Sequence, residues 1–238
     1  MSTLLLSDLH LPPEPSPLRE GFLRFLNGPA RNAEAVYILG DLYEVWIGDD
    51  RGLLDYGAEA AALKSLSATV PVFYMHGNRD FLLGRRYATA AGMTVLDDPF
   101  ILDLQGVRTV LAHGDRYCTD DLAYQKWRRF SRRPLAQFVY RNLPQFARAR
   151  IAGGIRSTSL VQKRQMAEDI MDVNAAAIAE AFSEPKLTRM IHGHTHRPAE
   201  HRMDVGGVAR ERIVLADWRP ERMEYLELTA QGYSRRLI

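Results

Sequence analysis

The chain contains very little cysteine: among its 238 residues, only Cys118 carries a thiol. A single thiol excludes an internal disulfide framework and is typical of a protein that works in a reducing compartment. The sequence also lacks any uncharged apolar run close to the ~18–20 residues that a bilayer-spanning helix needs. The apolar run from Leu4 to Leu6 is interrupted by Asp8 and His10 and has no basic leader, so no secretory signal is predicted.

One long stretch, residues 126–167, lacks acidic side chains altogether. It holds eleven Lys and Arg residues, although the whole chain has a net charge of only +2, so the remainder is acidic overall. Because like charges repel unless something neutralises them, a basic block on an acidic body favours an anionic partner such as phosphate, nucleic acid or lipid headgroups. A solvated helical face is the alternative interpretation.

The rest of the composition is ordinary for a soluble globular protein, with 46% hydrophobic and 25% charged residues. The length suits one large domain or a domain with an insertion. Neither an internal repeat nor a low-complexity segment occurs. We therefore expect a single domain over residues 1–238.

Short apolar runs alternate with segments of helical periodicity in the first half of the chain, which predicts an α/β fold. The runs predicted as strands are residues 3–7, 35–39, 70–75, 93–96, 100–104 and 107–112. The segments predicted as helices are residues 18–27, 56–69 and 81–92. Strands are predicted again at residues 187–191, 201–205, 208–215, 222–228 and 233–238.

Residues 120–183 show no strand pattern. Apolar stripes at helical spacing, such as Tyr124, Trp127 and Phe130, predict helices there. The segment contains the acid-free block, so we interpret it as a basic helical insertion, or cap, between the two halves of the strand system. Such stripes usually form a seam between helices, although Arg beside Phe and Leu also suits a helix at a lipid interface.

Side chains of the types that can bind metal ions (Asp, Asn and His) follow five of the predicted strands. Six of the seven histidines lie in these five places. The five clusters are Asp8-Leu9-His10, Gly40-Asp41, His76-Gly77-Asn78-Arg79-Asp80, His113-Gly114-Asp115 and His192-Gly193-His194-Thr195-His196. A lone Asp or His at such a place is usually structural. In open α/β sheets, however, ligands bind where the strands end, so five clusters at one edge predict a metal site.

The number of ligands indicates two ions rather than one. Roughly seven protein ligands are too many for a single tetrahedral ion, whereas Asp41 has two carboxylate oxygens and could hold two ions at once. Two-metal sites clamp a phosphoryl group for in-line attack. Carboxylate, amide and imidazole ligands without thiolate favour Mn, Fe or Zn and argue against a structural zinc site.

Taken together and in this order, the clusters resemble the motifs of the calcineurin-like metallophosphoesterases over about residues 3 to 198. The motifs are Asp8-x-His10, Gly40-Asp41, Gly77-Asn78-x-Asp80, His113 and Gly193-His194-x-His196. The resemblance implies a sandwich of two β-sheets flanked by helices. It also implies a first ion held by Asp8, His10, Asp41 and His196, and a second ion held by Asp41, Asn78, His113 and His194.

One position departs from the family pattern. Members of the family usually have a histidine after Gly-Asn, where it assists the leaving group, but this chain has Arg79. That feature resembles a narrower group within the family, the UDP-2,3-diacylglucosamine diphosphatases of lipid A biosynthesis. The matching segments are residues 39–50, 76–84, 118–121, 170–174 and 191–198.

The resemblance implies a hydrolase in which water activated by two Mn²⁺ ions, with Fe or Zn as the other candidates, attacks the α-phosphorus of UDP-2,3-diacylglucosamine. The products would be UMP and 2,3-diacylglucosamine 1-phosphate (lipid X). The implied catalytic residues are Asp41, Asn78, Arg79, Asp80 and His113. Because an arginine is always cationic, Arg79 would stabilise phosphate charge and would not donate a proton.

The resemblance further implies that residues of the insertion bind the sugar and its phosphate. The implied substrate-binding residues are Asn78, Arg79, Asp121, Ser159, Lys163, Met166 and His194. Lys163 and Met166 depart from the narrower group, which has a polar amide and a lysine at these two positions. Since Ser159, Lys163 and Met166 share one helical face, our hypothesis is that Lys163 supplies the cationic role.

The insertion would cover the site, hold the acyl chains along its apolar stripes and meet the anionic membrane surface with its basic face. We therefore expect a cytoplasmic protein, peripheral on the cytoplasmic face of the bacterial inner membrane, without a nucleic-acid partner. Two alternatives stay open. A phosphodiesterase for nucleotides or nucleic acid would track the phosphate backbone with the basic block, and a non-catalytic scaffold would use the same edge to bind a partner.

Overall fold

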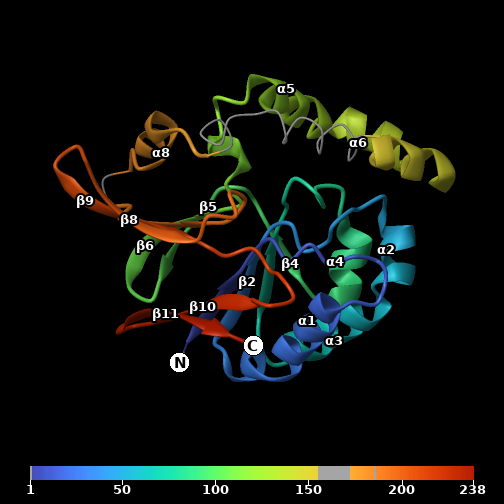
Figure 1. The fold of residues 1–238 in the computed structure, drawn as a ribbon, viewed down its shortest axis with the longest axis horizontal. Helices are drawn as coiled ribbons and strands as arrows, with labels where there is room; N and C mark the ends of the chain where they lie inside the picture. Colours follow the sequence, from blue (N-terminus) through green and yellow to red (C-terminus); the bar gives the residue numbers. More distant parts are fainter. Residues whose placement is uncertain (1, 155–171, 185) are drawn as a thin grey trace.

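The computed structural model of the chain describes residues 2–154, 172–184 and 186–238. Within these residues two β-sheets pack against each other, and helices cover their outer sides (Figure 1). The α/β class and the pair of sheets flanked by helices, which the resemblance implied, are confirmed. No helix in the described part of the chain is long and apolar enough to cross a membrane.

The first sheet combines four parallel strands from the N-terminal half with a C-terminal hairpin. Its strands are β1 (Thr3–Leu6), β2 (Ala35–Leu39), β3 (Val72–Met75), β4 (Thr94–Leu96), β10 (Glu224–Thr229) and β11 (Gly232–Leu237). They lie in the order β11-β10-β1-β2-β3-β4, with β10 antiparallel to β1. The two ends of the chain are therefore joined in one sheet.

The second sheet is mixed and has five strands. They are β5 (Phe100–Leu104), β6 (Val107–Ala112), β7 (Arg189–His192), β8 (Ala199–Val205) and β9 (Val208–Val214). The order is β5-β6-β7-β9-β8, and β6 pairs with β7 in parallel. Because β6 and β7 are direct neighbours, the predicted insertion takes the place of the crossover connection between them.

Strand β2 shows how the sequence places the core. All five of its residues are buried, as expected for a strand covered on both faces. Val36 and Ile38 pack toward the helices, whereas Tyr37 and Leu39 pack toward the second sheet. The alternation follows from the two-residue period of a strand, and it leaves Asp41 just beyond the buried end.

Four helices cover the outer face of the first sheet (Figure 1). They are α1 (Pro17–Asn27), α2 (Asp49–Asp55), α3 (Gly57–Ser67) and α4 (Arg85–Ala91). Helix α1 begins where its sequence predicts, because Ser16 caps it by accepting a hydrogen bond from the Arg19 N–H. Helix α4 starts later than residue 81, since Asp49 accepts hydrogen bonds from the N–H groups of Gly84 and Tyr87 and so caps it from outside.

Helix α2 occupies residues that the sequence pattern left as an acidic loop. Its first turn contains Asp49 and Asp50, which suit the positive end of a helix dipole. The Trp46 ring fills the space beside Gly52, where a Cβ would lie 2.1 Å from a ring carbon. The tertiary contact with Trp46 stabilises this short helix. The segment is too short for helical periodicity to predict it from the sequence.

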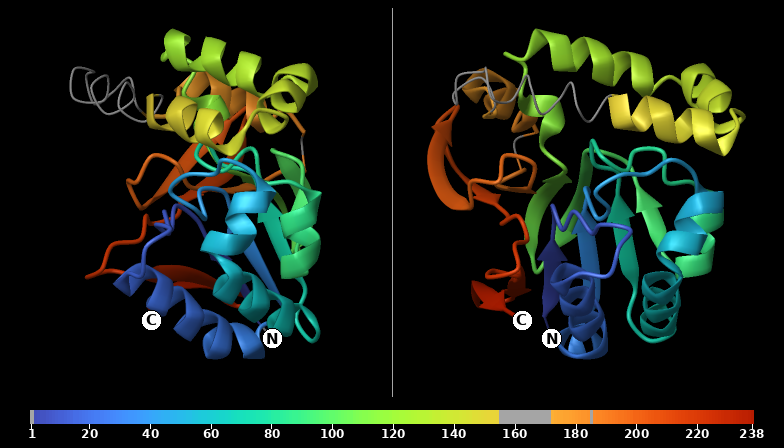
Figure 2. Two further views of the ribbon diagram at one scale, coloured as in Figure 1. Left: turned by 90° about the vertical axis from the view of Figure 1, so that its right-hand side faces the viewer. Right: turned by 45° about the vertical axis from the view of Figure 1, so that its right-hand side comes forward.

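The insertion lies across the end of the molecule opposite to the two chain termini (Figures 1 and 2). Its described helices are α5 (Leu122–Ser131), α6 (Pro134–Arg141), residues 145–154 and α8 (Ala175–Ala181). Strand β1 starts at the N-terminus, which lies at the end opposite to the insertion. Its carboxyl end therefore faces the insertion. Ser159, Lys163 and Met166, the substrate-binding residues predicted for the second part of the insertion, lie outside the described residues.

Part of the basic block finds its anionic partner within the same chain. Arg148 pairs with Asp50 at 2.5 Å. Arg128 pairs with Asp115 at 2.8 Å and with Asp98 at 3.1 Å. The repulsion that the sequence suggested is thus relieved partly by the acidic body, and these pairs attach the insertion to the sheets.

Candidate metal centre

The loops that follow β1, β2, β3, β6 and β7 bring the predicted ligands together in two groups. In the first group, His10 Nε2 lies 3.2 Å from His196 Nε2, and His196 Nε2 lies 3.3 Å from Asp8 Oδ1. His10 Nε2 also lies 3.9 Å from Asp41 Oδ2. Two imidazole nitrogens and two carboxylates that face one another form a suitable set of donors for a divalent cation.

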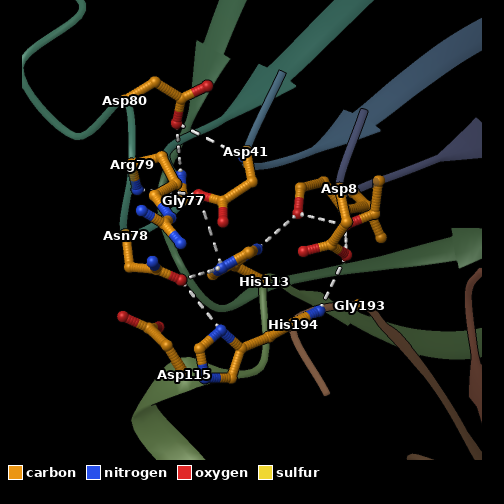
Figure 3. A network of polar contacts seen from close by, with 12 residues as sticks. Asp8, Asp41, Gly77, Asn78, Arg79, Asp80, His113, Asp115, Gly193 and His194 are labelled. Carbon is orange, nitrogen blue, oxygen red and sulfur yellow. Dashed lines mark hydrogen bonds and ion pairs between the residues drawn. The ribbon is translucent and has the colours of Figure 1, made fainter. Parts of the chain in front are cut away.

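The second group is centred on the side-chain oxygen of Asn78 (Figure 3). This oxygen lies 3.0 Å from His113 Nε2 and 2.8 Å from His194 Nδ1. His113 Nε2 in turn lies 3.8 Å from Asp41 Oδ1. An amide oxygen, two imidazoles and a carboxylate again fit a divalent ion.

Asp41 therefore turns one oxygen toward each group. Its side chain is buried, and its Oδ1 also accepts the backbone N–H of Arg79 at 2.8 Å. The neighbouring loop passes so close that a Cβ on Gly77 would lie 2.1 Å from Asp41 Oδ1. Only glycine permits this approach, which explains why Gly77 precedes Asn78.

Most of the ligands have an unusual backbone conformation. In the described chain six residues other than glycine have positive φ, and five of them are predicted ligands: Asp8 (56°), His10 (49°), Asp41 (52°), His194 (70°) and His196 (55°). The left-handed region costs an L-residue about 1–2 kcal/mol. Strain of this kind persists where the surrounding structure enforces it, and it clusters at functional sites.

Asp80 holds two of the ligand loops together. It is fully buried, and its Oδ1 accepts the N–H groups of Gly77 at 3.0 Å and Asp41 at 3.3 Å. Its Oδ2 accepts those of Leu42 at 2.7 Å and Tyr43 at 3.2 Å. Its carboxylate is thus engaged with backbone donors, which is a positioning arrangement; the catalytic role that the resemblance implied for Asp80 stays a prediction.

The outer nitrogens of three imidazoles face acceptors, as in many metal sites. His113 Nδ1 lies 2.9 Å from a backbone carbonyl oxygen at the end of β2. His10 Nδ1 lies 3.4 Å from Glu44 Oε2, and His196 Nδ1 lies 3.9 Å from Asp217 Oδ2. These contacts orient the rings so that Nε2 points into the centre.

Glu44 and Asp217 were not predicted as site residues. Glu44 lies three residues after Asp41, inside a segment that matched the narrower group, so its position was a usable signal. Asp217 follows β9 without any metal-binding motif. Its carboxylate also pairs with Arg219 and Arg222 at 2.8 Å, and nothing in the sequence near it indicates a place beside His196.

Arg79, for which the resemblance implied a charge-stabilising role, lies at the rim of the first group, beside Glu44. Its guanidinium is 3.9 Å from Glu44 Oε1, and its side chain is 18% exposed. A half-buried cation beside a candidate ion site is well placed to meet a phosphate. Asp121, another predicted substrate-binding residue, is half-buried and caps helix α5 by accepting the Tyr124 N–H at 2.9 Å.

Burial and mutual charge shift the pKa values of the ligands. Burial raises the pKa of Asp41 to about 7 and lowers that of His10 to about 3. Burial also favours neutral His113, but the charges of Asp41 and Asp8 outweigh it and raise the pKa to about 9. For Asp8, burial is outweighed by His196 and His113, so its pKa is lowered. Two of the predicted ligands, Asp41 and His113, therefore retain protons near neutral pH that an ion must displace.

We expect the affinity for divalent ions to increase with pH up to about 9. Asp41 gives up its proton near pH 7 and His113 near pH 9, and an ion binds only the deprotonated forms. Raising the pH removes these competing protons, so the affinity should rise most steeply below about pH 7 and level off above about pH 9. Titration calorimetry in buffers of different ionisation enthalpy would measure the released protons. An affinity that stays constant across this range would contradict the expectation.

Comparison with known proteins agrees with this geometry. The family described as Calcineurin-like phosphoesterase matches residues 1–198. The chain is 44% identical over 232 residues to "UDP-2,3-diacylglucosamine hydrolase" of Pseudomonas fluorescens, covering 97% of this chain and 92% of that protein. It is 45% identical over 222 residues to the protein of the same name from Serratia proteamaculans, covering 93% of this chain and 92% of that protein. Among solved structures, an archaeal phosphodiesterase shares the fold with a TM-score of 0.50, 12% identity and 100% coverage of both chains.

Proposed function

The chain belongs to the calcineurin-like phosphoesterase family of metal-dependent hydrolases, and we propose that it cleaves the pyrophosphate of UDP-2,3-diacylglucosamine. The products are UMP and 2,3-diacylglucosamine 1-phosphate, an intermediate of lipid A biosynthesis. The observation that carries this proposal is the near-full-length similarity to two hydrolases of that name. The place of Arg79 at the rim of the centre supports it.

The residues of the centre fit two divalent ions, for which we propose Mn²⁺. His10, His196, Asp8 and Asp41 would hold the first, and Asn78, His113, His194 and Asp41 the second. Such ions, when bound, lower the pKa of water enough to supply a nucleophile near neutral pH. The two oxygens of Asp41, which face different groups, would set the spacing of the ions.

Arg79 would bind the pyrophosphate from the rim. Its guanidinium can donate two parallel hydrogen bonds to phosphate oxygens, and it stays charged at any physiological pH. Its backbone N–H is anchored on Asp41 and its side chain faces Glu44, so the cation is oriented before the substrate arrives. The role is stabilisation of the negative charge that develops during attack at phosphorus.

The direct test offers UDP-2,3-diacylglucosamine and Mn²⁺ in water enriched in ¹⁸O. Attack at the α-phosphorus should release UMP and place the label in UMP, because this phosphorus leaves with the uridine. Label in the sugar phosphate would instead indicate attack at the β-phosphorus. A chain that cleaves only simple phosphodiesters would overturn the proposed substrate while leaving the family assignment intact.

The described helices of the insertion carry six exposed large apolar side chains, which we call the apolar patch. Its members are Leu122, Phe130, Leu135, Phe138, Val139 and Phe146, which are 53–78% exposed. Exposed Lys126, Arg129 and Arg133 occur in the same segment of the chain, between Leu122 and Leu135. An apolar surface with basic neighbours is typical of a helix that binds an anionic membrane surface. We propose that the apolar patch meets the lipid-linked substrate at the cytoplasmic face of the inner membrane.

Replacing Phe138 and Phe146 with serine should weaken binding to anionic phospholipid vesicles. Fully burying a large apolar side chain contributes about 1.5–3 kcal/mol, so the pair should lower the affinity at least about 100-fold. Vesicle sedimentation measures the change. Leu237→Ser is the matched control, because Leu237 is 68% exposed on β11 at the far end of the molecule. Equal binding by the double variant and the unmodified chain would refute the membrane role.

A further inference from the structure

Helix α5 has an inner face toward the metal centre and an outer face toward solvent. Tyr124, Arg128 and Arg132 are four residues apart and therefore share one face, and all three are partly buried. Arg129 and Arg133 immediately follow two of them in the sequence but are exposed. Arginines that are neighbours in the sequence thus have different environments, Arg129 within the helix and Arg133 just beyond its C-cap.

The inner face converges on Asp115, a fully buried carboxylate in the loop after β6. Its Oδ2 accepts hydrogen bonds from Arg128 Nε at 2.8 Å and from the Tyr124 hydroxyl at 2.5 Å. Arg132 lies 3.5 Å from the same oxygen. A buried carboxylate needs such partners to be tolerated, so these pairs dock helix α5 in one place.

From this docked position, the helix reaches the loop that carries Asn78. Arg132 Nη2 donates a hydrogen bond of 2.9 Å to the carbonyl oxygen of Gly77, the residue before Asn78. The guanidinium also lies over the ring of Phe81, 5.5 Å from its centre. Arg132 therefore holds this loop on both sides of the ligand.

The same helix reaches the other two ligands of the second group. Arg128 Nη2 donates to Asp98 Oδ2 at 3.1 Å, and Asp98 Oδ1 accepts the backbone N–H of His113 at 3.3 Å. The Tyr124 ring stacks on that of His194, with 6.2 Å between the centres and 25° between the planes. Each ligand of the second ion except Asp41 is thus reached from helix α5.

The first group is held by the body of the protein instead. Asp8 accepts hydrogen bonds from the Ser7 hydroxyl at 2.5 Å and from the His194 N–H at 2.8 Å. His10 faces Glu44, and the ring of His196 faces Asp217. Apart from Asp41, which both sites share, and the His194 N–H that reaches Asp8, the two ion sites depend on different parts of the chain.

We propose that Tyr124, Arg128 and Arg132 are positioning residues that complete the second ion site when the insertion is docked. This inference rests on the proposed two-ion centre. Docking of helix α5 fixes Asn78, His113 and His194, and without it the second ion binds more weakly while the first ion is unaffected. By linkage, occupation of the second site favours the docked insertion to the same extent.

The test is a Mn²⁺ titration of the purified, full-length chain. Calorimetry measures the affinity for each ion, and electron paramagnetic resonance detects the spin-coupled signal of the ion pair. Arg132→Gln should lower the affinity for the second ion about 10–100-fold, the usual effect of removing a residue that orients a metal ligand. The affinity for the first ion should stay unchanged. Arg129→Gln removes the same charge from the outer face of the helix, and Arg133→Gln removes it from the link between α5 and α6. Neither variant should alter the affinity for either ion.

Conservative variants separate positioning from folding. Arg132→Lys keeps a cation and one donor for the Gly77 carbonyl, so it should recover part of the second affinity. Tyr124→Phe keeps the ring on His194 but loses the hydrogen bond to Asp115. It replaces Arg128→Gln as the test of docking if the Arg128→Gln variant fails to fold. Equal loss of both affinities in Arg132→Gln, or equal effects of Arg132→Gln and Arg133→Gln, would overturn the inference. An unmodified chain that binds only one ion would instead refute the two-ion centre itself.

Discussion

Replacing Asp41 with alanine should remove both ions together and lower kcat by more than ~10³-fold. Loss of one group that stabilises a transition state electrostatically costs about 10²–10³-fold, and here the stabilisation from two ions is lost with a single side chain. The reason is geometric, because Asp41 Oδ2 faces the first group and Oδ1 faces the second. Metal analysis after gel filtration measures the ions directly.

His196→Ala is the control for Asp41→Ala. His196 belongs to the first group alone, where its Nε2 faces His10 and Asp8, so its replacement should cost one ion and retain the other. Circular dichroism would verify that both variants are folded. An Asp41→Ala variant that still held one ion tightly would contradict the bridging role of Asp41.

Replacing Asp80 with alanine should destabilise the fold more than any other change considered above. Four backbone N–H groups, those of Gly77, Asp41, Leu42 and Tyr43, lose their acceptor in a fully buried place. One unsatisfied buried donor costs about 1–3 kcal/mol, so we expect a loss of at least ~3 kcal/mol in the free energy of unfolding. For a domain of this size, Tm should fall by roughly 6–12 °C.

Asp121→Ala provides the comparison for Asp80→Ala. Asp121 caps helix α5 through one hydrogen bond, and loss of such a cap typically costs only ~1 kcal/mol. Differential scanning calorimetry of the two variants without added metal isolates the folding effect from ion binding. If Asp80→Ala kept its Tm but lost activity, Asp80 would be a catalytic group, as the family resemblance implied, and not a positioning residue.

The sequence predicts the strands and their polar ends well, because both signals are local. A strand such as β2 is an unbroken apolar run, and its ligand Asp41 follows at once. Which strands pair is not a local property. The contact between β1 and β10, for example, joins opposite ends of the chain, and periodicity contains nothing about it. The two-sheet arrangement therefore came only from the family resemblance.

The partners of the charged side chains could not be predicted from composition. The eleven basic residues of the acid-free block looked alike in the sequence. In the structure, Arg128 and Arg148 pair with acids of the body, whereas Arg129 and Arg133 are exposed. Helical spacing separates inner from outer positions but does not say which face is inner. The inner face is the one that meets Asp115 and Asp50, and these two residues lie in other segments of the chain.

The left-handed conformation of five ligands has a consequence for how such a protein evolves. A glycine at any of these positions would relieve a steric penalty of about 1–2 kcal/mol, and Asp8, His10, Asp41, His194 and His196 all have φ between 49° and 70°. At Asp8 and Asp41 this gain is offset, because the N–H groups of His194 and Arg79 would lose their acceptors. Selection for catalysis therefore acts against selection for stability at the three histidines. In a lineage that no longer needed the reaction, replacement of His10, His194 and His196 would be favoured as well as tolerated. Descendants without activity should then keep the fold and melt at higher temperature than their active ancestors.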